Sequence, residues 1–203
     1  MKKEMTITYI VGNSLYINVT NRCTNACEFC IRKNGDGAYG SDSLWLVREP
    51  DEAEILDSVF SHDLSAFSEV VFCGYGEPSI RLEAIINVAK KIKEKCNLPV
   101  RINTNGHSSL YHGYDTAPCY KDAFDCVSVS LNTPSPERYD ELCRPARAGA
   151  FAAMLDFTKE VKKYVPEVML SVVKDFLTED ELSECHKIAD SLGVYLKVRD
   201  YIS

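Results

Sequence analysis

Short runs rich in β-branched and aromatic residues alternate along the chain with longer segments whose apolar residues recur at helical spacing. The first two runs, 7–11 and 15–19, flank Gly12-Asn13-Ser14, which predicts a β-hairpin. Further strands are expected at 69–73, 99–104, 125–131, 167–174 and 194–199. The helices expected between them cover 50–60, 82–92, 136–142, 150–164 and 178–192. Strands that alternate with helices in this way predict an α/β fold with a parallel sheet.

About six strand–helix alternations predict the shape of that sheet. Right-handed crossovers favour a sheet that curves, and a complete (β/α)8 barrel needs about 250 residues, more than the 203 present. We therefore expect a partial (β/α)6 TIM-like barrel preceded by a short N-terminal hairpin, with a flat doubly wound sheet as the alternative. Residues 1–203 are expected to form a single domain.

Polar residues gather where the predicted strands end. Sites in α/β folds form at the carboxyl ends of strands, so these residues are expected to cluster at one face. Alternation along a strand sharpens the expectation. It gives one shared face to Cys126, Ser128, Ser130 and Asn132, the opposite face to Val127, Val129 and Leu131, and a polar face on the preceding strand to Arg101, Asn103 and Asn105.

Three cysteines with the spacing C-x3-C-x2-C follow the second strand of the hairpin, at Cys23, Cys27 and Cys30. Thiolates at such short spacings typically hold an iron–sulfur cluster, usually with four cysteines. Here the loop supplies three, which leaves one iron open to another ligand. A structural zinc site usually has four Cys or His ligands, and no histidine lies within thirty residues of Cys30. Distant cysteines could still complete a zinc site.

Composition narrows the function classes. The net charge of −7 argues against general nucleic-acid binding, and no apolar run approaches the roughly 20 residues that span a bilayer. Residues 1–4 lead directly into a strand pattern without the apolar region of a signal peptide. A cytoplasmic protein is therefore expected, in which nine cysteines serve as metal ligands and buried thiols.

The six cysteines outside the motif have different surroundings. Cys96 and Cys185 lie on predicted helices and are expected to be core or partly buried thiols. Cys73 lies on a strand and is also a candidate for the core. A second cluster formed by Cys119, Cys126 and Cys143 is conceivable, although their spacing matches no short cluster pattern.

The cysteine motif, with the aromatic Phe29 before its last cysteine, resembles the signature of the radical SAM superfamily. The run Gly-Tyr-Gly-Glu-Pro at 74–78 resembles the Gly-Gly-Glu-Pro motif of that family, with a tyrosine in place of one glycine. The runs at 73–78 and 142–145 are similar to those of the short TatD-associated radical SAM proteins. The resemblance extends from about Leu15 to the C-terminus.

The resemblance implies a set of ligands for two cofactors. Cys23, Cys27 and Cys30 would bind a [4Fe–4S] cluster, whose fourth iron is chelated by S-adenosylmethionine. Glu77 and nearby backbone carbonyls would bind the amino group of S-adenosylmethionine, since these groups accept hydrogen bonds from an ammonium. By the same resemblance Ser130 and Asn132 would contact the ribose and carboxylate of S-adenosylmethionine, and Lys174 its methionine carboxylate. The other candidates for contact with S-adenosylmethionine or the substrate are Phe29, Gly74, Tyr75, Gly76, Pro78, Asn103 and Asn105.

The activity implied by the resemblance is radical chemistry. An electron donor such as flavodoxin or ferredoxin would reduce the cluster, and S-adenosylmethionine would be cleaved to methionine and a 5′-deoxyadenosyl radical that abstracts hydrogen from an unidentified substrate. Because the chain ends just after its last strand, we expect a second chain or a large substrate, such as a protein or polynucleotide, to cover the mouth of the barrel. The alternatives are a non-catalytic iron–sulfur protein for electron transfer or redox sensing, which would need a fourth Cys ligand, and a zinc-stabilised binding module.

Overall fold

The structure, a computed structural model, describes residues 5–201, so the signal-peptide expectation at Met1 to Glu4 lies outside the described part. Within the described residues, seven strands form one sheet in the order β1-β2-β3-β4-β5-β6-β7. The first pair is antiparallel and all later neighbours are parallel. A doubly wound sheet reverses its strand order at a switch point, so the sequential order excludes that alternative. The prediction of a partial barrel with an N-terminal hairpin is confirmed.

The strands and helices follow the predicted alternation closely. The strands are β1 (Thr8–Val11), β2 (Ser14–Ile17), β3 (Glu69–Phe72), β4 (Val100–Thr104), β5 (Cys126–Ser130), β6 (Glu167–Val173) and β7 (Tyr195–Arg199). The α-helices are α1 (Glu52–Phe60), α2 (Leu82–Lys95), α3 (Ser108–His112), α4 (Pro136–Cys143), α5 (Ala150–Val161) and α6 (Glu179–Leu192). Short 3-10 helices are η1 (Ile31–Lys33), η2 (Leu64–Ala66), η3 (Pro78–Arg81), η4 (Ala117–Tyr120) and η5 (Lys174–Phe176).

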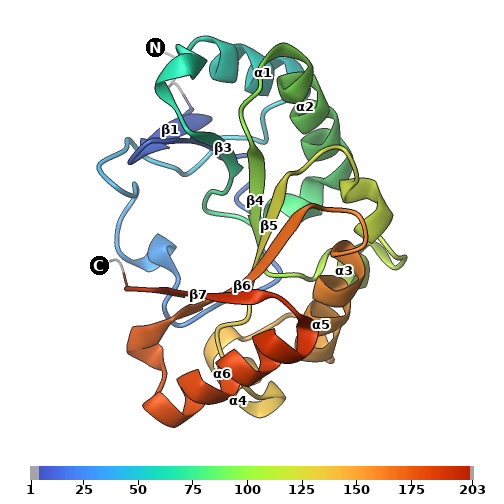
Figure 1. The fold of residues 1–203 in the computed structure, drawn as a ribbon. Helices are drawn as coiled ribbons and strands as arrows, with labels where there is room; N and C mark the ends of the chain where they lie inside the picture. Colours follow the sequence, from blue (N-terminus) through green and yellow to red (C-terminus); the bar gives the residue numbers. More distant parts are fainter. Residues whose placement is uncertain (1–4, 202–203) are drawn as a thin grey trace.

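The sheet curves, and the helices cover its convex side. In Figure 1 the strand direction turns progressively from β1 at the top to β7 at the bottom, with α1, α2, α3, α5 and α6 outside. The edge strands β1 and β7 are not hydrogen-bonded to each other. The barrel is therefore open on one side, which leaves its concave face accessible.

Local sequence signals fix where two of the helices begin and end. Asp51 caps α1 in a reciprocal capping box with Glu54, and Thr178 caps α6 in the same way. Gly193 ends α6 in the left-handed conformation at φ 62°, which glycine adopts without steric cost.

The two faces of the sheet differ in polarity, as the alternation along each strand predicts. On β5, Val127 and Val129 are fully buried in the main hydrophobic core beneath the helices. Ser128 and Ser130, on the opposite face, line a cavity. The apolar face thus stabilises the barrel, while the polar face is free for binding. Within the described residues, no helix is long and apolar enough to cross a membrane.

Replacement of Phe72 by alanine tests the account of the core. Phe72 is fully buried and contacts Phe124 edge to face, with ring centroids 5.6 Å apart. We expect Phe72→Ala to lower the free energy of unfolding by about 3–5 kcal/mol, because it leaves a cavity. Urea denaturation measures the loss. The control Tyr114→Ala removes a ring that is 55% exposed and should change stability by about 0.5 kcal/mol or less; equal losses would contradict the assigned core.

Candidate functional site

A cavity of about 430 Å³ lies on the concave face of the sheet, within the size range of small-molecule sites. Its wall is built from the cysteine loop, the concave faces of the strands and the segments that follow them. It brings together most of the residues that the sequence singled out. These are Cys23, Cys27, Phe29, Cys30, Gly74, Tyr75, Gly76, Glu77, Asn103, Asn105, Ser130 and Asn132.

Two of the predicted site residues, Pro78 and Lys174, lie outside the cavity wall. For Lys174 the structure also corrects the predicted contact. Pro78 is buried at the first position of η3, where it begins the helix. Lys174 was predicted to meet the carboxylate of S-adenosylmethionine, but β6 ends at Val173 and Lys174 begins η5. Its ammonium is exposed and pairs with Asp200 Oδ1 at 2.5 Å. The structure therefore does not place Lys174 in the cavity wall.

The cysteine loop is braced by the segment that follows α4. Ala26 N donates to the carbonyl of Cys143 at 3.1 Å, and Glu28 N donates to that of Leu142 at 2.8 Å. Asn25 and Pro145 form an isolated antiparallel bridge. The run at 142–145, which the sequence offered only as a family likeness, thus has a physical role, because it fixes the backbone that carries Cys27.

The three motif thiols lie in surroundings that suit thiolate ligands. Arg32 Nε donates to Cys30 Sγ at 3.1 Å, and Asn25 N donates to Cys23 Sγ at 3.4 Å. Burial raises the pKa of Cys23 to about 12. Metal-bound thiols are deprotonated, so assembly of a cluster would release protons. Three thiols on one short loop, with an arginine and a backbone N–H that donate hydrogen bonds to them, fit the ligand set of an iron–sulfur cluster.

The remaining thiols do not form a second centre. Among residues 5–201, no three His, Cys, Asp or Glu side chains, the motif cysteines included, are arranged as a finished metal site. Cys119 packs against the hydrophobic core, Cys126 is buried at the start of β5 and Cys143 ends α4, so these three thiols, unlike those of the motif, do not share one short loop. Instead the thiol of Cys143 contacts Cys27, and this contact together with burial raises the pKa of Cys27.

Glu77 is a buried carboxylate of the cavity wall that three hydrogen bonds hold in place. Its carboxylate is 4% exposed and accepts hydrogen bonds from Thr104 Oγ1 at 2.7 Å, Asn105 N at 2.7 Å and Ser79 N at 3.0 Å. Burial raises the pKa of Glu77, and these hydrogen bonds oppose that rise. A carboxylate has about four acceptor positions, so one remains for an ammonium group.

The glycines of the 74–78 motif allow it to touch the cysteine loop. A Cβ atom on Gly76 would lie 2.3 Å from the carbonyl oxygen of Thr20 and 2.5 Å from that of Arg22. Glu77 N donates to the same Arg22 oxygen at 2.8 Å. Tyr75 is tolerated between the glycines because its hydroxyl points away, to within 2.8 Å of the carbonyl oxygen of Gly35.

A buried hydrogen-bond network supports the cysteine loop from behind. Thr24 Oγ1 accepts from Asn105 Nδ2 at 2.7 Å and lies 3.2 Å from His107 Nδ1. The other ring nitrogen of His107 lies 3.1 Å from the hydroxyl of Tyr139, which accepts from Asn25 Nδ2 at 3.1 Å. Burial lowers the pKa of His107 to about 4. The ring is therefore neutral at pH 7 and links the loop to β4 and α4.

Three buried polar atoms of the cavity-lining residues have no partner within the part of the chain that the structure describes. They are Asn25 Oδ1, Asn132 Oδ1 and Arg199 Nε. Asn132 has φ 62° and donates through Nδ2 to Cys143 Sγ at 3.4 Å. Unpaired buried polar atoms cost free energy, so their presence fits a cavity that takes a polar ligand.

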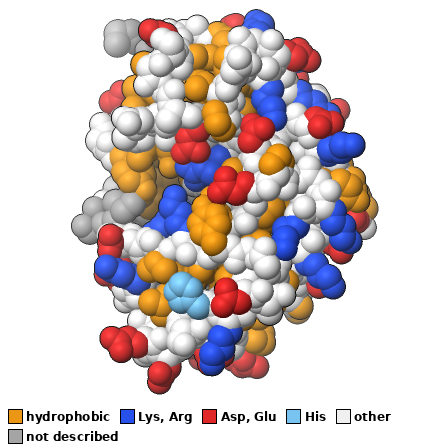
Figure 2. Space-filling view, viewed as in Figure 1, with side chains coloured by type: hydrophobic (Ala, Val, Ile, Leu, Met, Phe, Trp, Pro, Cys, Tyr) orange, Lys and Arg blue, Asp and Glu red, His pale blue; other side chains and the backbone are white. Residues whose placement is uncertain are grey.

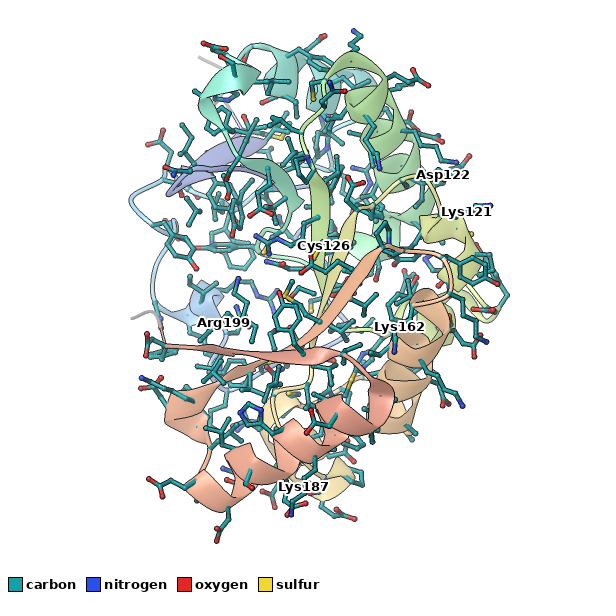
Figure 3. The ribbon with its side chains drawn as sticks, viewed as in Figure 1. Lys121, Asp122, Cys126, Lys162, Lys187 and Arg199 are labelled. Carbon is teal, nitrogen blue, oxygen red and sulfur yellow. The ribbon has the colours of Figure 1, made fainter. Side chains whose placement is uncertain are left out.

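Several cavity residues were missed by the sequence reasoning or assigned elsewhere. Cys73, a candidate for the core, lines the cavity instead. Tyr9 and Tyr16 reach it from the hairpin, and Lys197 and Arg199 reach it from β7. The sequence held a signal for the two cations: Lys197 and Arg199 are two positions apart on β7, so they share one face of the strand. Figure 3 shows Arg199 extending from β7 toward the space enclosed by the sheet.

Comparison with known proteins gives one family. The sequence model of the radical SAM superfamily matches residues 17–188. A GTP 3′,8-cyclase of Rhizobium leguminosarum bv. trifolii is 26% identical over 193 residues, which cover 91% of this chain and 50% of the relative. A probable GTP 3′,8-cyclase of Methanothermobacter marburgensis is 34% identical over 131 residues, which cover 64% of this chain and 39% of the relative. The chain thus spans half or less of the length of these relatives.

The solved structures show the same fold. Streptococcus suis SuiB bound to its precursor peptide SuiA matches with a TM-score of 0.69 at 17% identity. The match covers 94% of this chain and 39% of that one. At this identity the likeness concerns the fold alone.

Substitution of Gly76 tests the contact between the motif and the cysteine loop. The Cβ of Gly76→Ala meets two backbone oxygens, so the loop must move. We expect the free energy of unfolding to fall by about 1–3 kcal/mol and the iron content after anaerobic reconstitution to drop. The control Gly113→Ala has φ 79° and open space around the new Cβ, so its cost is conformational and its iron content should match the wild type. An unchanged iron content in Gly76→Ala would refute the contact.

Because burial lowers the pKa of His107, the stability of the fold should depend on pH. Its pKa is about 4 in the fold against 6.5 for a free histidine. The unfolded chain therefore takes up the proton first as the pH falls, and stability decreases from pH 6.5 toward pH 4 by up to about 3 kcal/mol. Urea denaturation of His107→Gln should show a shallower decrease across this window. A variant with the same slope as the wild type would rule out His107 as its source.

Proposed function

Because this chain belongs to the radical SAM superfamily, we propose that Cys23, Cys27 and Cys30 hold a [4Fe–4S] cluster against S-adenosylmethionine in the cavity. Members of this family use these two cofactors, and the chain is an enzyme of the radical SAM class. The proposal is that a substrate enters the same cavity and loses a hydrogen atom there.

The observation that carries the proposal is the meeting of three kinds of group in one cavity. Three thiols, a buried carboxylate with one acceptor position left, and unpaired amide oxygens line the same space. A thiol site for zinc or for electron transfer alone would give no role to the acceptor position left on Glu77 or to the unpaired Oδ1 of Asn132. A cofactor with an amino group and several hydroxyl groups would donate hydrogen bonds to both of these oxygens.

When bound, the two cofactors supply a 5′-deoxyadenosyl radical by one-electron reductive cleavage of S-adenosylmethionine to methionine. The residues of the chain provide binding and orientation. Arg32 donates a hydrogen bond to Cys30 Sγ and so stabilises its thiolate. Glu77 would accept a hydrogen bond from the amino group of S-adenosylmethionine, and Ser130 and Asn132 would contact its ribose and carboxylate. Phe29 packs on Phe176, with ring centroids 5.1 Å apart, and so helps to fix the position of the cysteine loop.

Partners follow from the same chemistry. We propose that flavodoxin or ferredoxin donates the electron, and that a second chain or a large substrate covers the mouth of the barrel. Assignment to the TatD-associated subgroup stays a prediction. The relatives are named for their reaction on GTP, so GTP is one substrate to test.

The electron-transfer alternative has one observation in its favour. It needs a fourth cysteine ligand, and the thiol of Cys143 contacts Cys27. If Cys143 were that ligand, Cys143→Ala would lose the four-iron cluster. In the proposed function the cluster keeps three protein ligands, so Cys143→Ala retains it.

The test is anaerobic reconstitution with iron and sulfide, followed by reduction in the presence of S-adenosylmethionine. Chromatography should detect 5′-deoxyadenosine from the wild type and at least about 100-fold less from Cys27→Ala, since catalysis depends on the bound cofactor. The matched control is Cys185→Ala, which removes a buried thiol of α6 outside the cavity wall and should remain active. A stable four-iron cluster without cleavage would favour the electron-transfer alternative.

A further inference from the structure

Strand β7 presents two cations to the cavity. Lys197 and Arg199 both line it, and the register pairs Lys197 with Ser171 and Arg199 with Val173 of β6. Arg199 Nη2 lies 3.5 Å from Ser171 Oγ. In Figure 2, which shows the face seen in Figure 1, basic side chains stand beside hydrophobic and acidic ones at the central hollow. The positive charge is local, because the whole chain carries a net charge of −7.

The carboxylates nearby are already engaged. Glu77 and Asp200 are the acidic residues of the cavity wall among the described residues. Glu77 is held by the end of β4, and Asp200 pairs with Lys174. Glu69, just outside the wall, makes a two-bond pair with Arg101 at 2.7 and 2.9 Å. These contacts neutralise Arg101 but not the cations of β7.

Lys197 and Arg199 have no ion pair within residues 5–201, and the buried Nε of Arg199 has no hydrogen-bond partner there. An unpaired guanidinium nitrogen is costly to bury. A planar guanidinium matches the geometry of a carboxylate or phosphate, to which it can donate two parallel hydrogen bonds. An oxyanion at this position would satisfy Nε and balance both charges.

We propose that Arg199 and Lys197, with the hydroxyl of Ser171, form a subsite for an oxyanion, a carboxylate or phosphate, carried by the substrate. This inference rests on the proposed function in so far as the occupant is the substrate. The subsite fixes the charged end of that molecule on β7, and the rest of it lies in the cavity wall shared with the cysteine loop.

The rival occupant is the carboxylate of S-adenosylmethionine. Lys174, which the family resemblance assigned to that carboxylate, lies outside the cavity wall. Ser130 and Asn132 remain for it on and after β5. The two occupants differ in one measurable way. A substrate subsite binds a free oxyanion without affecting the affinity for the cofactor.

The test is isothermal titration of the anaerobically reconstituted enzyme with inorganic pyrophosphate and, separately, with succinate. We expect at least one probe to bind, and the tighter one names the group as phosphate or carboxylate. Arg199→Gln should weaken that binding about tenfold or more, since it removes a charged hydrogen bond. Arg199→Lys, which keeps the positive charge, should retain part of the probe binding. Residual binding in this variant would also show that the strand still folds.

The matched control is Lys187→Gln, which removes one charge from α6. Lys187 is 66% exposed, pairs with Glu184 and lies far from Arg199 in Figure 3, so its loss should leave probe binding unchanged. Equal binding to all the variants, or no binding of either probe at millimolar concentrations, would overturn the subsite. The subsite would also be overturned if Arg199→Gln lost as much affinity for S-adenosylmethionine as for the probe, because the guanidinium would then hold the cofactor.

The two proposals can fail separately. Probe binding needs no cleavage of S-adenosylmethionine, and the cleavage assay needs no substrate oxyanion. Probe binding that depends on Arg199, found in an enzyme that yields no 5′-deoxyadenosine, would support the subsite and refute the radical chemistry.

Discussion

Through its carboxylate and its backbone N–H, Glu77 joins three segments that are far apart in the sequence, and the geometry of the cavity depends on this junction. It accepts hydrogen bonds from its own turn at Ser79 and from the end of β4 at Thr104 and Asn105. The backbone N–H of Glu77 donates to Arg22 in the cysteine loop. One buried residue thus sets how the loop after β2, the turn after β3 and the end of β4 lie together. A buried carboxylate is stable only when so satisfied.

The cysteine loop is held between two supports. The motif glycines contact it from one side, where Gly76 leaves no room for a side chain. The segment after α4 hydrogen-bonds it from the other side, and Thr24, His107 and Tyr139 connect the two. Rigid placement of ligands before the cofactor arrives lowers the cost of ordering them on binding. The three thiols therefore lie on a backbone whose position is already defined.

Much of this arrangement could be predicted from the sequence. The alternation on β5 correctly separated Ser128 and Ser130 from the buried valines, because a strand places successive side chains on opposite faces. Cys73 was harder to place. Val70, Val71 and Phe72 are all fully buried, so β3 reads as a continuous apolar run without alternation, as parallel strands often do.

Lys174 and the cations of β7 show what the sequence could not supply. Lys174 follows the strand by one residue, and its turn directs it to Asp200. Arg199 reaches the cavity because the sheet curves, which depends on all seven strands. Side-chain partners that come from tertiary curvature leave no local pattern in the chain.

The central claim is that the cluster bound by the three cysteines has an iron to which S-adenosylmethionine binds. Electron–nuclear double resonance of the reduced cluster, with S-adenosylmethionine labelled with ¹⁵N at its amino group, tests it directly. A nitrogen coupling is expected in the wild type, because the amino group of the cofactor, once deprotonated, would bind the open iron and donate its remaining N–H to Glu77. A four-iron cluster whose spectrum shows no nitrogen coupling with the labelled cofactor present would contradict the account.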